Sequence, residues 1–135
     1  MLTEKIVARA SLRYAIVVDE SKLVARLAAK FPTPVELVRD ARVTAMRALE
    51  ALGGKPVLRM AKMKDGPVIT DHGNLVLDVT FPRPFDPVDM EARIALIPGV
   101  TASGIFTVPV TDLFVGAADG AVRHQTAAAG GPRNG

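Results

Sequence analysis

The chain has 135 residues, of which 49% are hydrophobic and 23% charged, a composition that is typical of a folded globular protein and excludes a disordered one. It has no cysteine, so disulfides, thiolate catalysis and cysteine-ligated zinc sites are excluded. The net charge of +3 hides a basic first half, with thirteen basic and six acidic residues up to position 64, but only 4% of the residues are aromatic, which argues against a nucleic-acid-binding surface.

The first residues predict a helix that leads into a buried strand. Residues 3–13 carry a narrow apolar stripe at helical spacing, and Tyr14–Val18 is an almost unbroken apolar run, as in strands of a parallel sheet that is covered on both faces. Polar residues follow this strand directly, namely Asp19, Glu20, Ser21 and Lys22. Open α/β sheets bind ligands just beyond the carboxyl ends of their strands, so this cluster is a candidate binding site.

A proline-rich crossing then separates two structural units. A short helix is expected over residues 23–29, and prolines at positions 32 and 34 force an extended chain after it. The elements expected next are a strand at 35–38, a helix at 41–52 that Gly53-Gly54 ends, and a strand at 56–60.

A hairpin is expected after these elements. Val68–Thr70 and Leu75–Val79 are rich in β-branched residues, and residues 71–74 between them, Asp-His-Gly-Asn, tolerate the positive φ of a tight turn. His72 therefore has a turn role, and His124 a solvent role, since neither has a plausible metal partner.

A helix and a strand complete this stretch. Asp86 before Pro87 is the pattern of an N-cap followed by proline at the first helical position, and apolar residues recur at helical spacing behind it. The acids Asp86, Asp89 and Glu91 are explained by capping and by the helix dipole. Pro98-Gly99 ends the helix, and residues 100–106 run extended.

The order of elements over residues 34–106 predicts a ferredoxin-like βαββαβ domain. One more short strand is expected at 113–115, and from Arg123 the chain has no periodic apolar pattern, which predicts a disordered tail. The predicted fold class is α/β (α+β), with the ferredoxin-like domain inserted in the remnant of a Rossmann-like parallel-sheet domain.

Several segments together resemble a known family. They are Glu4-Lys5-Ile6-Val7-Ala8, the Asp19–Lys22 cluster, the D-x-G-N turn, D-P-x-x-M-E, I-P-G-V and G-I-F. In this order they resemble the carboxy-terminal part of ribose-5-phosphate isomerase, the type A enzyme of the pentose phosphate pathway, over about residues 2–122.

The resemblance implies an aldose–ketose isomerase that interconverts ribose 5-phosphate and ribulose 5-phosphate through an enediolate, without a metal or an organic cofactor. It places Glu4 at the general-base position and Lys22 against the sugar phosphate, and Asp19 orients Lys22 or lines the site. Without the resemblance, Glu4 is explained as an acid in the first turn of a helix, where it favours the helix dipole, and Lys22 as an exposed lysine after a strand.

Three segments of the family's amino-terminal half do not occur here: G-T-G-S-T, D-G-A-D-E and K-G-G-G. The expected protein is therefore a truncated isomerase that is inactive or nearly so by itself. Its expected domains are a partial Rossmann-like domain of 1–31 and 107–122, a ferredoxin-like lid or oligomerisation domain of 32–106, and a tail of 123–135. Open strand edges favour a homo-oligomer or capture of a complementing amino-terminal half.

Two other functions stay open at this point. The chain can be a non-catalytic ferredoxin-like binding or assembly module that kept the fold and lost the reaction. Nucleic-acid binding through the basic half has nothing else in its favour, so no nucleic acid is expected as a partner. No secretory signal or membrane-spanning segment is visible, and the expected location is cytoplasmic, with no membrane contact.

Overall fold

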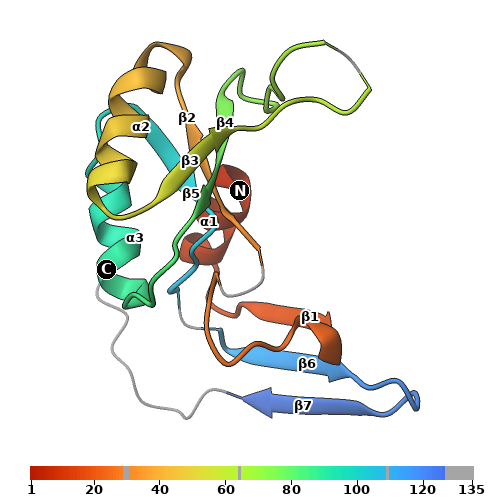
Figure 1. Ribbon diagram of the computed structural model, residues 1–135. Coiled ribbons are helices and arrows are strands. Elements are labelled where there is room, and N and C mark those ends of the chain that lie inside the picture. The colour runs from red at the N-terminus through yellow and green to blue at the C-terminus, as the bar shows by residue number, and fades with distance from the viewer. Residues whose placement is uncertain (29–30, 64, 109, 127–135) are drawn as a thin grey trace. The chain divides into compact units, whose positions relative to one another are not determined.

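The computed structural model describes residues 1–28, 31–63, 65–108 and 110–126. The chain divides into two compact units (Figure 1). The first unit comprises Met1–Ile6 and Arg26–Thr107, and the second comprises Val7–Ala25 and Val108–Gly135. The first helix, α1 (Leu2–Ala10), begins in the first unit and ends in the second.

The first unit is a four-stranded antiparallel sheet with two helices. Its elements are β2 (Thr33–Leu37), the 3-10 turn η2 (Arg39–Ala41), α2 (Arg42–Ala51), β3 (Lys55–Leu58), β4 (Leu75–Thr80), α3 (Pro87–Ala95) and β5 (Val100–Ser103). The strand order is β3-β4-β2-β5, and every neighbouring pair is antiparallel. This is the predicted βαββαβ arrangement within a mixed α/β fold.

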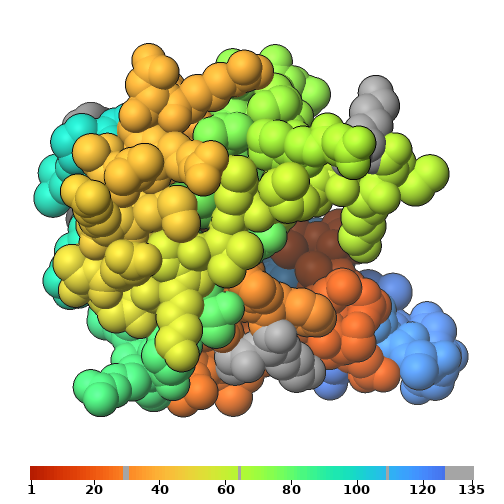
Figure 2. Space-filling view, turned by 45° about the horizontal axis from the view of Figure 1, so that its top comes forward, coloured from red at the N-terminus to blue at the C-terminus, as the bar shows by residue number. Residues whose placement is uncertain are grey.

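Alternation along the central strand divides the sheet into two faces. Val35 and Leu37 are fully buried in the apolar cluster that α2 and α3 complete, while Glu36 between them points to the opposite face. Both helices lie on one side of the sheet (Figure 1). Leu49 of α2 and Ile94 of α3 are fully buried against it. On their outer side α2 and β3 form one continuous surface (Figure 2).

The caps of the first unit follow the sequence pattern. Asp86 is the N-cap of α3, where its Oδ1 accepts a 2.8 Å hydrogen bond from the N–H of Asp89, and Pro87 is the first helical residue. At the end of α2, Gly53 has a φ of +83°, a conformation that favours glycine.

The predicted hairpin is only partly correct. Leu75–Thr80 forms β4, but its strand partners are β3 and β2, and Val68–Thr70 contributes a single isolated bridge at Ile69. The turn itself is present, since the N–H of Thr70 donates to the carbonyl of Asn74 and the N–H of Gly73 donates to the carbonyl of Thr70. Val68–Thr70 does not extend into a strand, and β2 and β3 occupy the two sides of β4 instead.

The second unit contains a three-stranded sheet in the order β1-β6-β7. Strand β1 (Ala15–Asp19) pairs in parallel with β6 (Asp112–Gly116), and β6 pairs antiparallel with β7 (Val122–Thr126). The parallel pairing agrees with the sequence. The expected burial of β1 does not, because its residues alternate between exposed and half-buried and Val17 is 78% exposed.

Two further predictions for this part of the chain are wrong. Residues 23–28 are not helical, and Ala28 has a φ of +56° that a helix cannot contain. Residue 29, the last of the predicted helix, lies outside the described residues. The tail predicted from Arg123 begins too early, because 123–126 belongs to β7; residues 127–135 also lie outside the described residues.

Candidate active site

Glu4 lies in the first turn of α1, in the first unit, with 66% of its side chain exposed. Its Oε2 is 2.5 Å from the amino group of Met1. The hydrogen bond from that ammonium group, helped by the backbone N–H of Glu4 itself, lowers the pKa of the Glu4 carboxyl below its ordinary value. The side chain is thus an exposed, ionised carboxylate, the state that a proton acceptor requires.

Lys5, the next residue of α1, is held in a nearly closed polar site. Its Nζ donates hydrogen bonds to Glu91 Oε1, to the carbonyl of Ile105 at 2.6 Å and to Ser103 Oγ at 3.3 Å. The ring centroid of Phe106 lies 5.0 Å from Nζ, within range of a cation–π contact. An ammonium group has three N–H donors, so these three acceptors use all of them.

Glu91 is the buried partner of Lys5. Its second oxygen accepts hydrogen bonds from the backbone N–H of Thr107, at 3.0 Å, and from the Thr107 hydroxyl. Burial by itself raises the pKa of Glu91, but the hydrogen bonds from Lys5 and Thr107 and the charge of Lys5 outweigh it and hold the pKa below its ordinary value.

The interpretation of Glu91 as an acid of the helix start is therefore wrong. The side chain is only 8% exposed and pairs with Lys5 instead of with the helix end. The sequence does contain a signal, because Glu91 stands three residues before Ile94 and next to Met90, so it falls on the apolar side of α3. A carboxylate on the buried side of a helix is expected to pair with a cation, because glutamate is rarely buried without a partner.

The predicted substrate-binding residues lie in the second unit, directly after β1. Asp19 is the N-cap of the 3-10 turn η1 (Glu20–Lys22), and its Oδ1 accepts hydrogen bonds from the N–H of Ser21, at 3.0 Å, and from the Ser21 hydroxyl. The Ser21 side chain is the main cause of the lowered pKa of Asp19, and the charge of Lys22 adds to it. Lys22 is the last residue of η1 and is exposed.

The structure thus gathers Asp19 and Lys22 in one turn at the carboxyl end of a parallel strand, as the sequence predicts. Glu4 belongs to the other unit. Among the described residues, no group of three or more His, Asp or Glu side chains could hold a metal ion. In the same part of the chain, no helix is long and apolar enough to cross a membrane.

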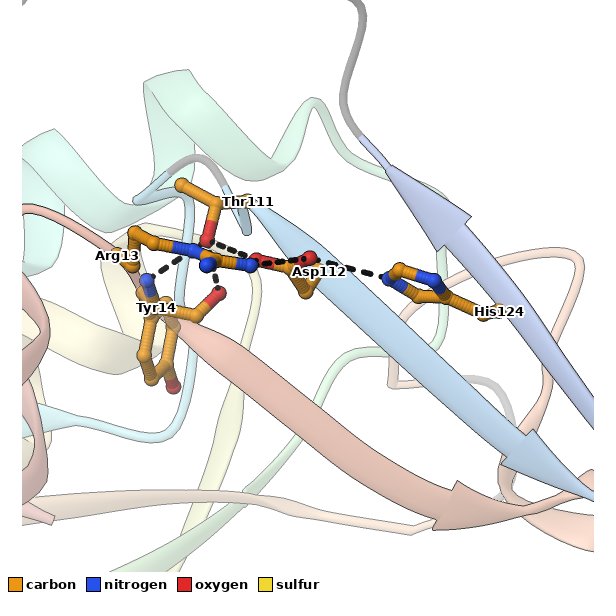
Figure 3. Close-up of polar contacts among 5 residues, drawn as sticks. All are labelled: Arg13, Tyr14, Thr111, Asp112 and His124. Carbon is orange, nitrogen blue, oxygen red and sulfur yellow. Dashed lines mark hydrogen bonds and ion pairs between the residues drawn. The ribbon is translucent and has the colours of Figure 1, made fainter.

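A second polar cluster surrounds Asp112 (Figure 3). This carboxylate is 5% exposed and accepts hydrogen bonds from Arg13, at 3.0 and 3.1 Å, and from the hydroxyl of Thr111, at 2.9 Å. His124 Nε2 lies 3.0 Å from its Oδ1. Its neighbours, first the Thr111 hydroxyl and then Arg13 and His124, lower the pKa of Asp112.

The Asp112 cluster ties the strands of the second unit together. The Thr111 hydroxyl also accepts a hydrogen bond from the N–H of Tyr14, whose carbonyl accepts one from the N–H of Thr111, and the His124 ring stacks on Phe114 with centroids 4.2 Å apart. The solvent role predicted for His124 is only partly correct, because the side chain is 44% exposed but β7 carries it back onto β6. These contacts attach the start of β6 to β7 and to the residues just before β1.

The sequence matches the family model described as "Ribose 5-phosphate isomerase A (phosphoriboisomerase A)" over residues 1–120. It is 51% identical over 118 residues to Ribose-5-phosphate isomerase A of a Synechococcus species, a match that covers 87% of this chain and 50% of that protein. For the Haloarcula marismortui protein of the same name the identity is 45% over 117 residues, covering 87% and 50%.

Solved structures agree with these matches. The ribose 5-phosphate isomerase A of Methanocaldococcus jannaschii superposes with a TM-score of 0.86 at 42% identity, covering 93% of this chain and 55% of that one. A D-ribose-5-phosphate isomerase in complex with phospho-erythronic acid gives a TM-score of 0.85 at 40% identity, covering 92% and 54%. The chain spans about half the length of the curated relatives it matches. It belongs to the ribose-5-phosphate isomerase A family, of which it represents the carboxy-terminal part.

Proposed function

We propose that this chain supplies the carboxy-terminal part of an isomerase that interconverts ribose 5-phosphate and ribulose 5-phosphate, and that it needs an amino-terminal half to do so. The observation that carries the proposal is the match to the family over residues 1–120, which includes Glu4, an exposed carboxylate in the first turn of α1. The cytoplasmic location expected from the sequence stays a prediction.

The proposed reaction moves two protons within the sugar phosphate, one between carbons and one between oxygens, and exchanges no other atoms. Glu4 takes the proton from C2 of the aldose, which leaves an enediolate, and returns it to C1 while the hydroxyl proton of C2 passes to the C1 oxygen. The ammonium group of Lys22 stabilises the negative charge that develops on the oxygens or binds the phosphate, and Asp19 beside it keeps the turn in shape.

The second unit supports the need for a partner. Among its described residues, only Ala8 and Val115 are buried apolar side chains. Large apolar residues are exposed instead: Val7, Leu12, Val17, Leu23, Val24 and Val122. Strand β1 also ends the sheet, so the hydrogen-bonding groups of its outer edge have no strand partner within this sheet. We infer that an amino-terminal half of the family covers this unit, with a homo-oligomer as the alternative.

The first unit, in contrast, closes its own core of twelve buried apolar residues. This observation favours the second candidate function, a non-catalytic ferredoxin-like binding or assembly module. In that case the domain of residues 32–106, proposed as a lid or oligomerisation domain, binds the partner, and Glu4 has no chemical role.

Complementation separates the two functions. The purified chain is mixed with a separately expressed amino-terminal half of a family member, and ribulose 5-phosphate formation is followed. We expect little turnover from the chain alone, turnover from the mixture, and none from the mixture with Glu4→Gln. Glu50→Gln, which changes an exposed glutamate of α2, is the matched control and keeps full turnover.

Ordinary turnover by the isolated chain contradicts the need for a partner. A mixture that associates but is inactive, or one in which Glu4→Gln changes nothing, supports the binding module instead.

A further inference from the structure

We propose that Lys5 and Glu91 act as a positioning pair that fixes the direction of the Glu4 carboxylate. The inference rests on the proposed function and extends it to two residues that never touch the substrate. It starts from an unusual neighbourhood: an exposed glutamate is followed directly by a lysine whose side chain is only 14% exposed.

The contacts of Lys5 leave it no capacity for a substrate. All three of its N–H donors are used by Glu91, Ser103 and the carbonyl of Ile105, and Glu91 is in turn bonded by Thr107. Ser103 belongs to β5, and Ile105 and Thr107 follow it, while Glu91 belongs to α3. The ammonium group of Lys5 therefore ties the start of α1 to two elements of the first unit at once.

Apart from Lys5, the half-buried Met1 and Leu2 anchor this part of α1. Within the first-unit part of the helix, Ile6 is 58% exposed and Glu4 is 66% exposed. The Lys5 side chain is the most enclosed polar anchor in this turn, and a buried ion pair with full hydrogen bonding is directional in a way that apolar contact is not.

Because Lys5 and Glu4 are neighbours in one helix, fixing the Lys5 side chain also fixes the position of Glu4. Successive side chains of an α-helix are about 100° apart around its axis, so holding Lys5 fixes both the rotation and the height of the turn that carries Glu4. Proton transfer is sensitive to such placement, since a shift of about 1 Å in a reacting group can reduce the rate about a hundredfold. Loss of the pair should then slow the chemical step and leave substrate binding nearly unchanged.

The test uses Lys5→Met, Glu91→Gln and their double variant in the complemented enzyme. We expect kcat to fall about tenfold or more, with KM within about twofold, because the alignment of the base is lost and the phosphate contacts are not. The double variant is expected to be no worse than the worse single one, since both changes break the same interaction. Thr107→Val, which removes only the hydroxyl donor to Glu91, gives a smaller effect of the same kind and covers the case that the other variants fold poorly.

Asp78→Asn is the matched control. It breaks the other half-buried ion pair of the same unit, in which Arg59 Nε lies 2.9 Å from Asp78 Oδ2, and it should leave kcat unchanged. Hydrogen exchange of the Lys5 amide, which donates to the carbonyl of Met1 at 3.1 Å, gives a readout without activity. It should become faster in the Lys5 and Glu91 variants and not in the control.

An unchanged kcat, or exchange no faster than in the control, overturns the positioning pair. If the unsubstituted mixture shows no isomerase turnover at all, the proposed function fails, and the exchange measurement alone decides whether the pair holds the helix.

Discussion

Glu36 and Asn74, 38 residues apart in sequence, meet inside the first unit, where Asn74 Nδ2 donates a 3.0 Å hydrogen bond to Glu36 Oε1. The same oxygen accepts a 2.9 Å hydrogen bond from the hydroxyl of Thr70. Glu36 lies on the face of the sheet away from the apolar core, so these bonds attach the turn of residues 70–74 to the central strand. His72 sits in this turn, as predicted, with its Nδ1 4.0 Å from Glu36.

Replacing Glu36 by leucine should destabilise the first unit by about 2–4 kcal/mol, because a buried donor, Asn74, and a half-buried one, Thr70, then lose their acceptor. Glu36→Gln keeps an oxygen at the same place and should cost far less. Urea denaturation of both variants measures the difference in the free energy of unfolding. Equal losses would mean that the buried charge, and not the acceptor, is what the turn requires.

Two glycines with almost the same backbone angle should respond differently to alanine. Gly99 has a φ of +85° and Gly53 a φ of +83°, but a Cβ on Gly99 would overlap with the side chain of Ala41, whereas a Cβ on Gly53 meets nothing within 4 Å. Gly53→Ala should cost about 1–2 kcal/mol from backbone strain alone. Gly99→Ala should cost about 1–3 kcal/mol more. Thermal and urea unfolding of the two variants test this order.

The core of the first unit predicts a contrast between two leucines at helix ends. Leu49 of α2 is fully buried, and Leu96, just after α3, is 82% exposed. Leu49→Ala should lower the free energy of unfolding by about 2–5 kcal/mol, since it leaves a cavity under the sheet. Leu96→Ala should change it by less than about 0.5 kcal/mol. A similar loss for both would contradict the packing described here.

Acid should loosen the start of α1 through Glu91. The pKa of Glu91 is lowered in the folded chain, so its contribution to stability is complete above the ordinary value of 4.5 and is lost as the pH falls through the lower folded value. Hydrogen exchange of the Lys5 amide should therefore be slower in the unsubstituted chain than in Glu91→Gln at neutral pH. The difference should shrink well below pH 4.5; a constant difference would exclude ionised Glu91 as its source.

The sequence was informative wherever local pattern and fold agree. The order of strands and helices over the first unit, the cap at Asp86 and the turn after β1 follow from spacing and from residue type alone. The parallel strand at 15–19 is also visible as an apolar run. The exposure of this strand could not be predicted, because an apolar run indicates burial in a complete sheet. The match covers only 50% of the length of the Synechococcus relative.

Other features depend on partners distant in sequence. The roles of Lys5 and Glu91 arise from a contact between residues 86 positions apart, which neither helix reveals separately. Every residue of β7 is exposed and all but Val122 are polar, so its pairing with β6 and the link from His124 to Asp112 are what mark it as a strand. Residues 23–28, which are apolar except for Arg26, resemble a helix locally, yet no local signal ends that helix where Ala28 takes a positive φ.

The pairing of β1 with β6 also sets an order of folding. Nearly the whole first unit lies between these two strands in sequence, so joining them in an unfolded chain closes a very long loop, which is entropically costly and slow. Once the first unit has folded, β1 and β6 are attached to the same folded unit. The loop that must still close between them is then short. Variants that delay the first unit, such as Leu49→Ala, should then slow the appearance of the β1–β6 sheet in refolding, although they lie outside it.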